Sequence, residues 1–328
     1  MRKLICFFAL LIVLGLGAGV MFLYYAYSPI PHLNETHYIT VNSGDTVQTL
    51  SDRLATQGAE ERKNLFFWAA RAFGMGIHLK AGTYAIEPGM SPKQVFDLLS
   101  SGKTVAKRIT IPEGYSIQQI DFLLAKEGYL KLGEFQKIAS DPELIALMMV
   151  PSDTLEGYLF PDTYFFSAPF GASDFAKMLL DQFDMVWTEE YSNRAAEMGM
   201  TRHQIITLAS IIEKETGRAD ERALVSSVFH NRLRRGMPLQ ADPTVVYGVK
   251  EYNGTITKRH LKTPTPYNTY IIPALPPGPI CNPSKAAIVA TLYPEKTDYL
   301  FFVAKDDGSH VFTTHYRAHS QYVNRYQR

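Results

Sequence analysis

One glutamate of this 328-residue chain, Glu213, has a position that suits acid–base chemistry. The surrounding segment 201–217 predicts a helix that begins at Thr201, where a capping box with Gln204 is expected, and stops at Gly217. Glu213 falls on the flank of the expected buried side, whereas Lys214 falls on the side that faces water. At about 100° per residue, the buried stripe of this helix is expected to consist of Ile205, Leu208, Ala209 and Ile212.

A carboxyl group in that position is expected to hold its proton more firmly than one in water. Burial beside apolar side chains disfavours the charged form, and the last turn of a helix disfavours negative charge. Both effects raise the expected pKa of Glu213 toward the range in which a carboxylic acid donates a proton near neutral pH. Glu215 points elsewhere on the wheel, near Leu208. A solvated Glu213 at the helix edge remains the alternative.

Polar loops follow this helix and a second predicted helix, 220–235. The loops 236–248, 263–270 and 274–283 are rich in amide, carboxyl, hydroxyl and aromatic side chains, which suit hydrogen bonds to hydroxyl groups and stacking on sugar rings. As simpler alternatives, proline-rich loops can serve as rigid connections, and Asp242-Pro243 can form an ordinary turn. The substrate-binding candidates in these loops are Gln240, Asp242, Thr244, Tyr247, Tyr267, Asn268, Thr269 and Tyr270.

Other combinations of reactive residues are incomplete. His310, His315 and His319 include a pair spaced i, i+4, but no H-E-x-x-H sequence or carboxylate partner completes a metal site. Cys281 has no histidine close in sequence, which favours a buried structural thiol over a nucleophile. We therefore expect neither a metal nor a cofactor.

The first thirty residues predict a membrane anchor. Residues 1–3 carry two basic side chains, and residues 4–27 carry no charge. As a helix this stretch would reach about 36 Å, more than the roughly 30 Å of a hydrocarbon core. Because basic residues stay on the cytoplasmic side, we expect a single-pass anchor in the cytoplasmic (inner) membrane. The N-terminus would lie in the cytoplasm and the bulk of the chain in the periplasm or outside the cell. A cleaved signal peptide is the alternative, which the length of the apolar stretch disfavours.

A near-repeat follows the anchor and a proline-containing spacer, 28–37. The segments 41–58 and 111–128 each predict a short strand, a glycine turn, a Thr or Ser cap and an amphipathic helix closed by glycine. Such a unit resembles the LysM type of glycan-binding module, and a bare structural spacer is the alternative. The identical pairs are Gly44 and Gly114, Gln48 and Gln118, Leu54 and Leu124, Ala55 and Ala125, and Gly58 and Gly128.

These elements predict an α+β protein in two parts after the transmembrane helix 4–27. Residues 38–150 would form the region of small LysM-like strand–helix modules. Residues 151–328 would form a mixed α+β catalytic domain built around the helix that carries Glu213. With 46% apolar and 20% charged residues the chain is too hydrophobic to be disordered. The balance of 33 basic against 32 acidic residues argues against a nucleic-acid partner.

Several long strings, in the same order, carry a resemblance to a known family. LASIIEKETG (208–217), SVFHNRLRRGMPLQADPTVVYG (227–248), TPYNTY (265–270) and LPPGPICNP (275–283) are similar to the YceG-like family of endolytic murein transglycosylases. EGYLFPDTY (156–164) and TIPEGYS (110–116) fit as well, so the resemblance covers essentially the whole chain. Ala274, Ser284 and Ser309 stand where glycine is expected, which puts the loop backbones in doubt but not the chemistry.

The resemblance implies a lyase that cleaves the β-1,4 bond between N-acetylmuramic acid and N-acetylglucosamine without water. The first Glu of the E-K-E-T string, here Glu213, would protonate the glycosidic oxygen and then take the proton from the muramoyl C6 hydroxyl, which closes a 1,6-anhydro ring. One carboxylate suffices because the nucleophile is internal. The loop candidates would stabilise the oxocarbenium-like centre.

The resemblance also implies a cellular setting. The substrate would be the nascent glycan strands of peptidoglycan, whose length the cuts would limit during cell-wall synthesis. Peptidoglycan synthases, the penicillin-binding proteins, would be neighbours in the same membrane.

Two rival functions remain open. In one, a hydrolase uses Asp242 as the general base on water. In the other, the chain is a non-catalytic, membrane-tethered peptidoglycan-binding scaffold built on the LysM-like repeats. The scaffold reading predicts that Glu213→Gln leaves the digestion of murein unchanged.

Overall fold

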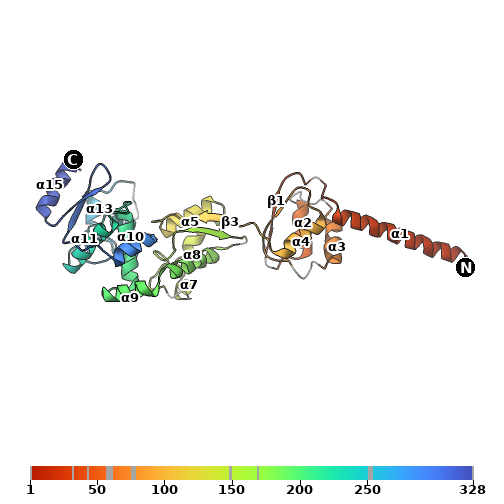
Figure 1. The fold of residues 1–328 in the computed structure, drawn as a ribbon, viewed down its shortest axis with the longest axis horizontal. Coiled ribbons are helices and arrows are strands. Elements are labelled where there is room, and N and C mark those ends of the chain that lie inside the picture. Colours follow the sequence, from red (N-terminus) through yellow and green to blue (C-terminus); the bar gives the residue numbers. More distant parts are fainter. Residues whose placement is uncertain are drawn as a thin grey trace. The chain divides into compact units, whose positions relative to one another are not determined.

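The computed structural model describes residues 2–31, 33–42, 44–56, 62–74, 79–147, 150–167, 170–249 and 254–326 (Figure 1). Their contacts form two compact units, Met1–Ile109 with Phe165–Phe170, and Thr110–Tyr164 with Gly171–Arg328. Helices and strands are mixed, so the predicted α+β class is confirmed. The expected functional boundary near residue 150 stays a prediction.

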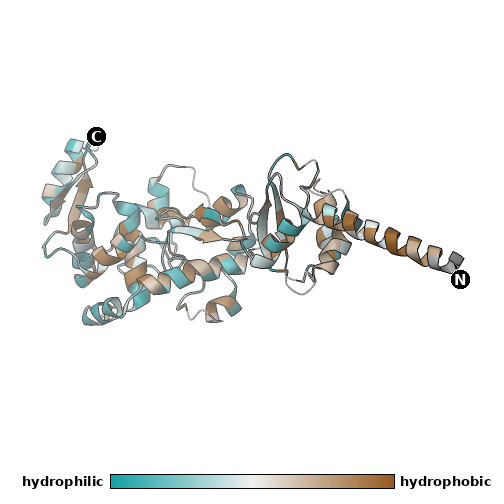
Figure 2. Ribbon diagram, turned by 45° about the vertical axis from the view of Figure 1, so that its right-hand side comes forward, coloured by the Kyte–Doolittle hydropathy of each residue, from teal (hydrophilic) through white to brown (hydrophobic). Residues whose placement is uncertain are grey.

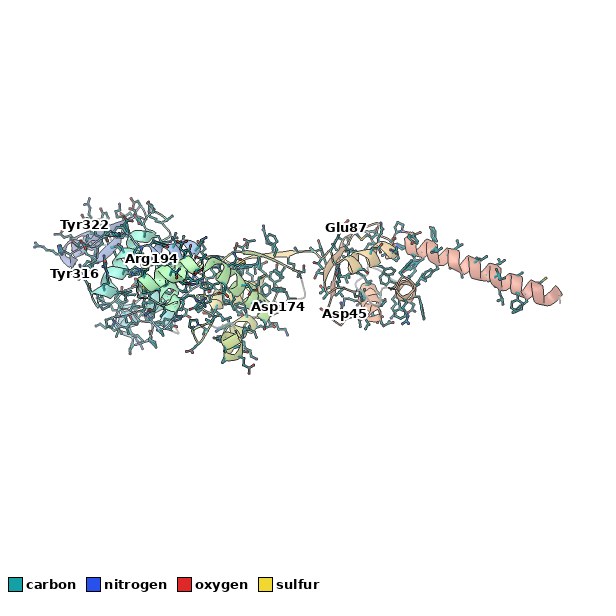
Figure 3. The ribbon with its side chains drawn as sticks, turned by 60° about the horizontal axis from the view of Figure 1, so that its bottom comes forward. Asp45, Glu87, Asp174, Arg194, Tyr316 and Tyr322 are labelled. Carbon is teal, nitrogen blue, oxygen red and sulfur yellow. The ribbon has the colours of Figure 1, made fainter. Side chains whose placement is uncertain are left out.

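The N-terminal helix α1 (Arg2–Tyr27) is long and apolar enough to cross a membrane over Cys6–Tyr27. Its residues are mostly hydrophobic (Figure 2), and most of its side chains project away from the helix without being covered by the described chain (Figure 3). Burial begins only at its end, where Tyr25 and Ala26 pack into the first unit. Ile30 and Leu33, from the segment expected to be a spacer, are buried in the same core.

The first unit is built on an antiparallel strand pair, β1 with β2, in which Ile39 lies opposite Tyr84. Strand alternation turns Ile39 and Val41 into the core and leaves Tyr38 exposed. Helices supply the rest of that core. The elements of this unit are β1 (His37–Val41), α2 (Val47–Thr56), α3 (Lys63–Ala72), β2 (Gly82–Ile86) and α4 (Pro92–Ser101).

The strand–glycine–helix pattern of the near-repeat is present in the structure. Gly44, before α2, and Gly114, before α5 (Ile117–Lys126), have φ angles of 87° and 72°, which favour glycine. Ser116 caps α5 in a capping box with Gln119. Gly58, at the end of the first copy, lies outside the described residues. By its contacts α5 belongs to the second unit, so the two copies lie in different units.

The second unit is mainly helical, and the hairpin β5–β6 pairs Phe301 with Thr313 near its end. Strand β3 pairs with β4, and these two strands have residues in both units, because 107–109 and 165–166 belong to the first. The remaining elements are β3 (Lys107–Thr110), α6 (Glu134–Ile138), α7 (Pro142–Leu147), β4 (Thr163–Phe166), α8 (Ala172–Val186), α9 (Glu189–Glu197), α10 (Arg202–Glu215), α11 (Arg222–Arg234), α12 (Asp242–Gly248), α13 (Lys258–Lys262), α14 (Lys285–Leu292), β5 (Phe301–Ala304), β6 (His310–Thr313) and α15 (Tyr316–Tyr326).

Helix α10 lies at the centre of this unit and begins with the predicted capping box of Thr201 and Gln204. The predicted stripe is buried, but Ile206 and Ile211 are buried too, because α9, α11, α12 and α14 all pack against α10. The helix ends at Glu215, two residues before Gly217, since Thr216 is already extended.

Cys281 is buried against α10, as predicted for a structural thiol. Its Sγ donates a hydrogen bond to the Ser210 carbonyl at 3.3 Å, and burial raises the pKa of the thiol well above its ordinary value. A thiol that keeps its proton is a poor nucleophile.

Asp121 of α5 fixes the start of α6. Its buried carboxylate accepts backbone N–H groups from Gly133 at 2.7 Å, Phe135 at 3.0 Å and Gln136 at 3.2 Å. These are the donors that the first turn of a helix leaves without an intrahelical partner. Asp121 therefore holds α5 and α6 together.

Asp121→Ala is expected to cost about 3 kcal/mol of unfolding free energy, because three N–H groups, the buried one of Phe135 among them, lose their acceptor. The exposed Asp174 accepts one N–H, from Gly171 at 2.8 Å, so the control Asp174→Ala should cost about 1 kcal/mol or less. Urea denaturation of the detergent-solubilised full chain, followed by Trp187 fluorescence in a Trp68→Phe background, measures both. Equal losses for the two variants would contradict the role given to Asp121.

Candidate functional site

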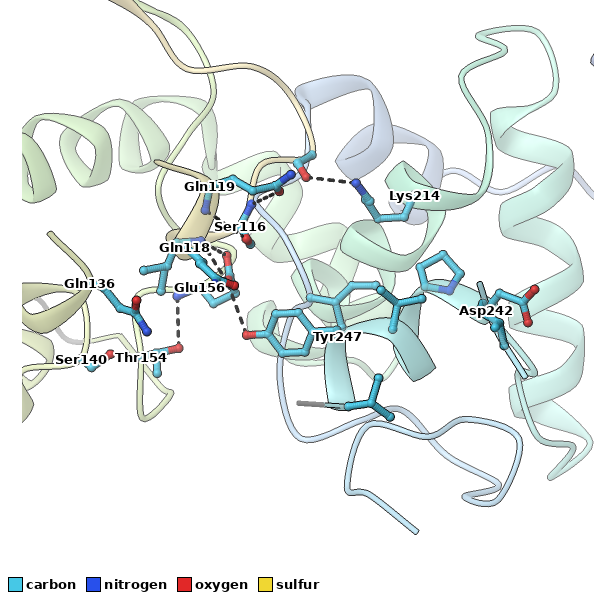
Figure 4. A pocket seen from close by; sticks show the side chains of 17 residues that line it. Ser116, Gln118, Gln119, Gln136, Ser140, Thr154, Glu156, Lys214, Asp242 and Tyr247 are labelled. Carbon is cyan, nitrogen blue, oxygen red and sulfur yellow. Dashed lines mark hydrogen bonds between the residues drawn. The ribbon is translucent and has the colours of Figure 1, made fainter. Parts of the chain in front are cut away.

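A cleft of about 890 Å³ opens in the second unit between the start of α5, the 154–156 turn and α12 (Figure 4). Asp242 and Tyr247 line it from α12, and Lys214 from the end of α10. The lining is rich in groups that hydrogen-bond hydroxyls. The other polar lining residues are Ser116, Gln118, Gln119, Gln136, Ser140, Thr154 and Glu156.

Glu156 is a buried carboxyl group at the wall of this cleft. Both of its oxygens accept the Ile117 N–H at 3.1 Å, and Asn282 Nδ2 donates to Oε1 at 3.1 Å. Tyr247 points toward it across the cleft and donates to Oε2 at 3.3 Å (Figure 4). Burial outweighs these donors and raises the pKa of Glu156 to about 8. This carboxyl group ties together the segments that form the cleft.

Asn282 completes the same junction. Its Oδ1 accepts the Leu159 N–H at 2.9 Å, and its Nδ2 also donates to the Tyr115 carbonyl at 2.9 Å. The backbone adds two bonds, from the Gly114 N–H to the Asn282 carbonyl and from the Asn282 N–H to the Tyr115 carbonyl, both 2.9 Å. The glycine turn before α5 is thereby attached to the loop that precedes α14.

The predicted acid, Glu213, is half-buried and hydrogen-bonded to the start of α14. Its Oε2 accepts the Ser284 N–H at 3.0 Å and the Ser284 hydroxyl at 2.5 Å. Ser284 is one of the positions where the sequence departs from glycine, and here its hydroxyl also caps α14. This contact joins the end of α10 to the start of α14.

Glu215, two residues on, has the opposite surroundings. It is half-buried, and its carboxyl group makes no hydrogen bond with any residue in the described ranges. Burial, and next the negative charge of Asp242, raise its pKa to about 8, although Arg232 opposes the shift. Such a group is a carboxylic acid near neutral pH, and no described residue donates a hydrogen bond to it.

Several predicted residues gather around Glu215. Asp242 accepts the Tyr270 hydroxyl at 2.6 Å, and burial raises the pKa of Tyr270. Arg232 is buried, and it donates to Gln240 Oε1 at 3.2 Å and to the Leu239 carbonyl at 2.8 Å. The structure thus brings Asp242, Gln240 and Tyr270 together with an arginine that the sequence prediction did not include.

Gln240 has an unusual backbone. Its φ of 52° is positive, which among the described residues is true of no other residue but glycine. The conformation is held by the Gln240 N–H, which donates to the Thr269 carbonyl at 3.0 Å. Non-glycine residues in this region store strain, and such strain is concentrated at functional sites.

Three other predicted substrate-binding residues are buried and already hydrogen-bonded. Thr244 and Thr269 bond each other through their hydroxyls at 2.8 Å, and Thr269 also accepts the Ala241 N–H at 3.0 Å. Asn268 donates to the Thr263 carbonyl at 2.8 Å and to two further carbonyls. These contacts hold the loops that present Asp242 and Tyr270, and a direct contact with substrate stays a prediction.

The last two predicted residues, Tyr247 and Tyr267, form an aromatic pair with ring centroids 4.8 Å apart. Both are partly exposed, and burial raises the pKa of both hydroxyls. Tyr247 presents its hydroxyl to Glu156 and its ring to the cleft.

Within the described ranges no group of three or more His, Cys, Asp or Glu side chains converges as a metal site would. His310 is instead paired with Glu221, from its Nδ1 to Oε2 at 2.6 Å. His319 lies with its ring on Phe301.

Four contributors to the site were not predicted from the sequence: Glu156, Glu215, Arg232 and Asn282. Glu156 lies in the EGYLFPDTY string, which was noted but given no role. Glu215 had a usable signal, because it is seven residues after Leu208 and three after Ile212, both of the predicted buried stripe.

The comparisons with known proteins agree with one another. Residues 39–325 match the model of the YceG-like family. An endolytic murein transglycosylase of Bacillus subtilis (strain 168) is 33% identical over 304 residues, which cover 88% of this chain and 84% of that protein. Another, of Streptococcus pneumoniae serotype 2 (strain D39), is 30% identical over 92% of this chain, which spans only 60% of that longer protein.

A solved structure supports the same relationship. The crystal structure at 2.6 Å of a yceG-like protein of Listeria monocytogenes shares 32% of its sequence with this chain and superposes with a TM-score of 0.61. The match covers 88% of this chain and 99% of the other. The chain is therefore a member of the YceG-like family.

Proposed function

We propose that this protein is an endolytic murein transglycosylase, which cuts the β-1,4 bond between N-acetylmuramic acid and N-acetylglucosamine inside peptidoglycan strands and leaves 1,6-anhydro ends. The family and the relatives' names support the reaction class. The observation that carries the site is a half-buried glutamate at the end of α10, with its pKa raised to about 8 beside Asp242.

Two glutamates of α10 compete for the role of the acid. Glu213 is the residue that the family resemblance implies, and its assignment stays a prediction. The geometry favours Glu215, because Glu213 already accepts two donors from Ser284 whereas Glu215 holds a proton near neutral pH. A general acid must carry a proton at the working pH and be able to pass it on.

The reaction then needs one carboxyl group in two steps. The acid gives its proton to the glycosidic oxygen as the bond from that oxygen to the anomeric carbon breaks. The resulting carboxylate takes the proton of the muramoyl C6 hydroxyl, whose oxygen forms the new bond to the anomeric carbon. The balance closes without water, and the enzyme returns to its protonated state.

Asp242, Gln240, Tyr270 and Arg232 supply the surroundings that this step needs. Positive charge develops at the anomeric carbon, and the Asp242 carboxylate, which accepts the Tyr270 hydroxyl, would stabilise that charge. Gln240 is held by Arg232 and offers its amide group for a sugar hydroxyl. In a hydrolase, Asp242 would instead activate a water molecule.

The cleft beside this centre suits a glycan strand. Its amide groups, from Gln118, Gln119 and Gln136, and its exposed Tyr247 ring are the kinds of group that bind sugar hydroxyls and sugar faces. Thr244, Asn268 and Thr269 would act by holding the loops, and Tyr267 by supporting Tyr247.

The cellular setting forms part of the proposal. Helix α1 would be a single-pass anchor in the cytoplasmic membrane, with residues 1–3 inside the cell and the units outside. Of the predicted LysM-like region 38–150, the second strand–helix copy would bind glycan as part of the cleft. The first copy would bind glycan or space the predicted catalytic domain 151–328 from the membrane. Peptidoglycan synthases would be partners, because both act on nascent strands.

Glu215→Gln is expected to lower the rate of 1,6-anhydro product formation by about 10²–10⁴, because an amide cannot supply the proton. Glu213→Gln keeps an acceptor for Ser284 and should lose less than about tenfold. The measurement is mass spectrometry of purified sacculi digested by the full chain in detergent, with each variant's folding checked by its thermal transition. The reverse ranking would return the role of acid to Glu213, and a failure of the unmodified chain itself to digest sacculi would favour the scaffold.

The pH profile tests the environment of the acid. Since the pKa of Glu215 is raised to about 8, the protonated form dominates below that pH, and kcat/KM is expected to fall as the pH rises through it. Asp242→Asn removes a negative charge that raises this pKa, so the falling limb should move to lower pH. An Asp174→Asn control should leave the limb in place. A limb that stays near pH 8 in Asp242→Asn would contradict the coupling.

Digestion in water enriched in ¹⁸O separates the transglycosylase from the hydrolase. The anhydro ring takes its oxygen from the sugar's own C6 hydroxyl, so new ends should carry no label and should weigh one water less than a reducing end. Labelled reducing ends would establish the hydrolase reading, with Asp242 as the base. Mass spectrometry of the released fragments reads both outcomes.

A further inference from the structure

Helix α3 lies on the side of the first unit from which α1 leaves (Figure 1). Contacts at both ends of α3 reach the last two turns of α1. Before its first residue, the Arg62 guanidinium lies 5.3 Å from the centroid of the Tyr25 ring. After its last residue, the Phe73 ring stacks on Phe22 at 6.4 Å and meets Tyr27 edge-on at 6.2 Å. The residues that flank α3 on both sides therefore contact the end of α1.

These contacts set the height of α3 relative to the apolar span. Phe22 belongs to the span Cys6–Tyr27, and five residues of helix separate it from Tyr27, or about 7.5 Å. The Phe73 ring therefore lies at the level of the last turns of the span. Tyr25 and Ala26 are buried in the first unit, so no free linker separates this unit from the end of α1.

The outward face of α3 has the composition of a helix that lies on a membrane. Phe66, Ala69 and Ala70 face the core and are fully buried. On the opposite side Trp68 is 62% exposed, and Arg71, three residues on, is exposed as well. Tryptophan prefers the region of the lipid headgroups, and arginine can bind their phosphates.

We propose that α3 is an interfacial helix, with Trp68 among the headgroups of the bilayer that α1 spans and with Arg71 against lipid phosphates. The proposal rests on α1 being the anchor described under the proposed function. Its occupant is lipid because the residues at both ends of α3, Arg62 and Phe73, contact the last turns of the apolar span. Such a contact would fix the orientation of the first unit relative to the membrane.

The chain offers its own probe, because its two tryptophans lie in different units, Trp68 in the first and Trp187 in the second. The full-length Trp187→Phe variant, which keeps Trp68, is reconstituted into phosphatidylglycerol and phosphatidylethanolamine vesicles whose acyl chains are brominated near the headgroup. We expect these lipids to lower the emission of Trp68 by about half, since a tryptophan at the interface lies within contact of the bromine atoms. The matched Trp68→Phe variant, which keeps Trp187, should show little loss.

Two further measurements make the result decisive. Arg71→Glu in the Trp187→Phe background should reduce the quenching, whereas Arg235→Glu, an exposed arginine of the second unit, should not. Alkaline carbonate extraction tests the anchor: a chain that is extracted has no spanning α1, and the interfacial proposal falls with it, while the transglycosylase assay is unaffected by that outcome.

One result overturns the proposal: the chain resists carbonate extraction, but the brominated lipids do not quench the emission of Trp68. Access of aqueous iodide to Trp68 in those vesicles would show a face open to water. Protection from iodide without quenching by lipid would instead show a second copy or another protein on this face.

Discussion

The buried carboxyl group of Glu156 is the interaction on which the candidate site depends. It joins the start of α5 through Ile117, the loop before α14 through Asn282, and α12 through Tyr247. A carboxyl group buried to this degree is costly unless donors surround it. The three donors come from segments that are distant in sequence, so they can satisfy Glu156 only when the whole cleft is assembled. The junction therefore couples the shape of the cleft to the folding of the unit.

The glutamates around the cleft differ in surroundings rather than in chemistry. Glu156 is surrounded by donors, Glu213 binds the start of a helix, and Glu215 lies in a half-buried place beside another carboxylate. Environment separates a structural carboxyl group from one that can exchange a proton with a substrate. The neighbouring Arg232 limits the pKa shift at Glu215 and also holds the Gln240 loop, so one buried cation affects both Glu215 and its surroundings.

Local signals predicted the local structure well. The capping boxes of Thr201 and Ser116 and the glycine turns before α2 and α5 depend on residues a few positions apart, which a sequence displays directly. The surroundings of Glu215 were not predicted, because the helical wheel assumes one buried side, while helices pack around most of α10. The Glu156–Asn282 contact joins residues 126 positions apart. A contact between residues so far apart leaves no periodic pattern in a single sequence, so the sequence alone could not predict it.

At Gln240, whose backbone is left-handed, stability favours glycine while the proposed activity favours the amide side chain. Glycine adopts a φ of 52° at little cost, whereas a residue with a side chain is strained there. A change to glycine would relieve the strain but delete the amide that Arg232 orients. Selection for stability alone would therefore favour the replacement of Gln240 by glycine. A glutamine retained there in related chains would mark selection for what its side chain does to a bound glycan.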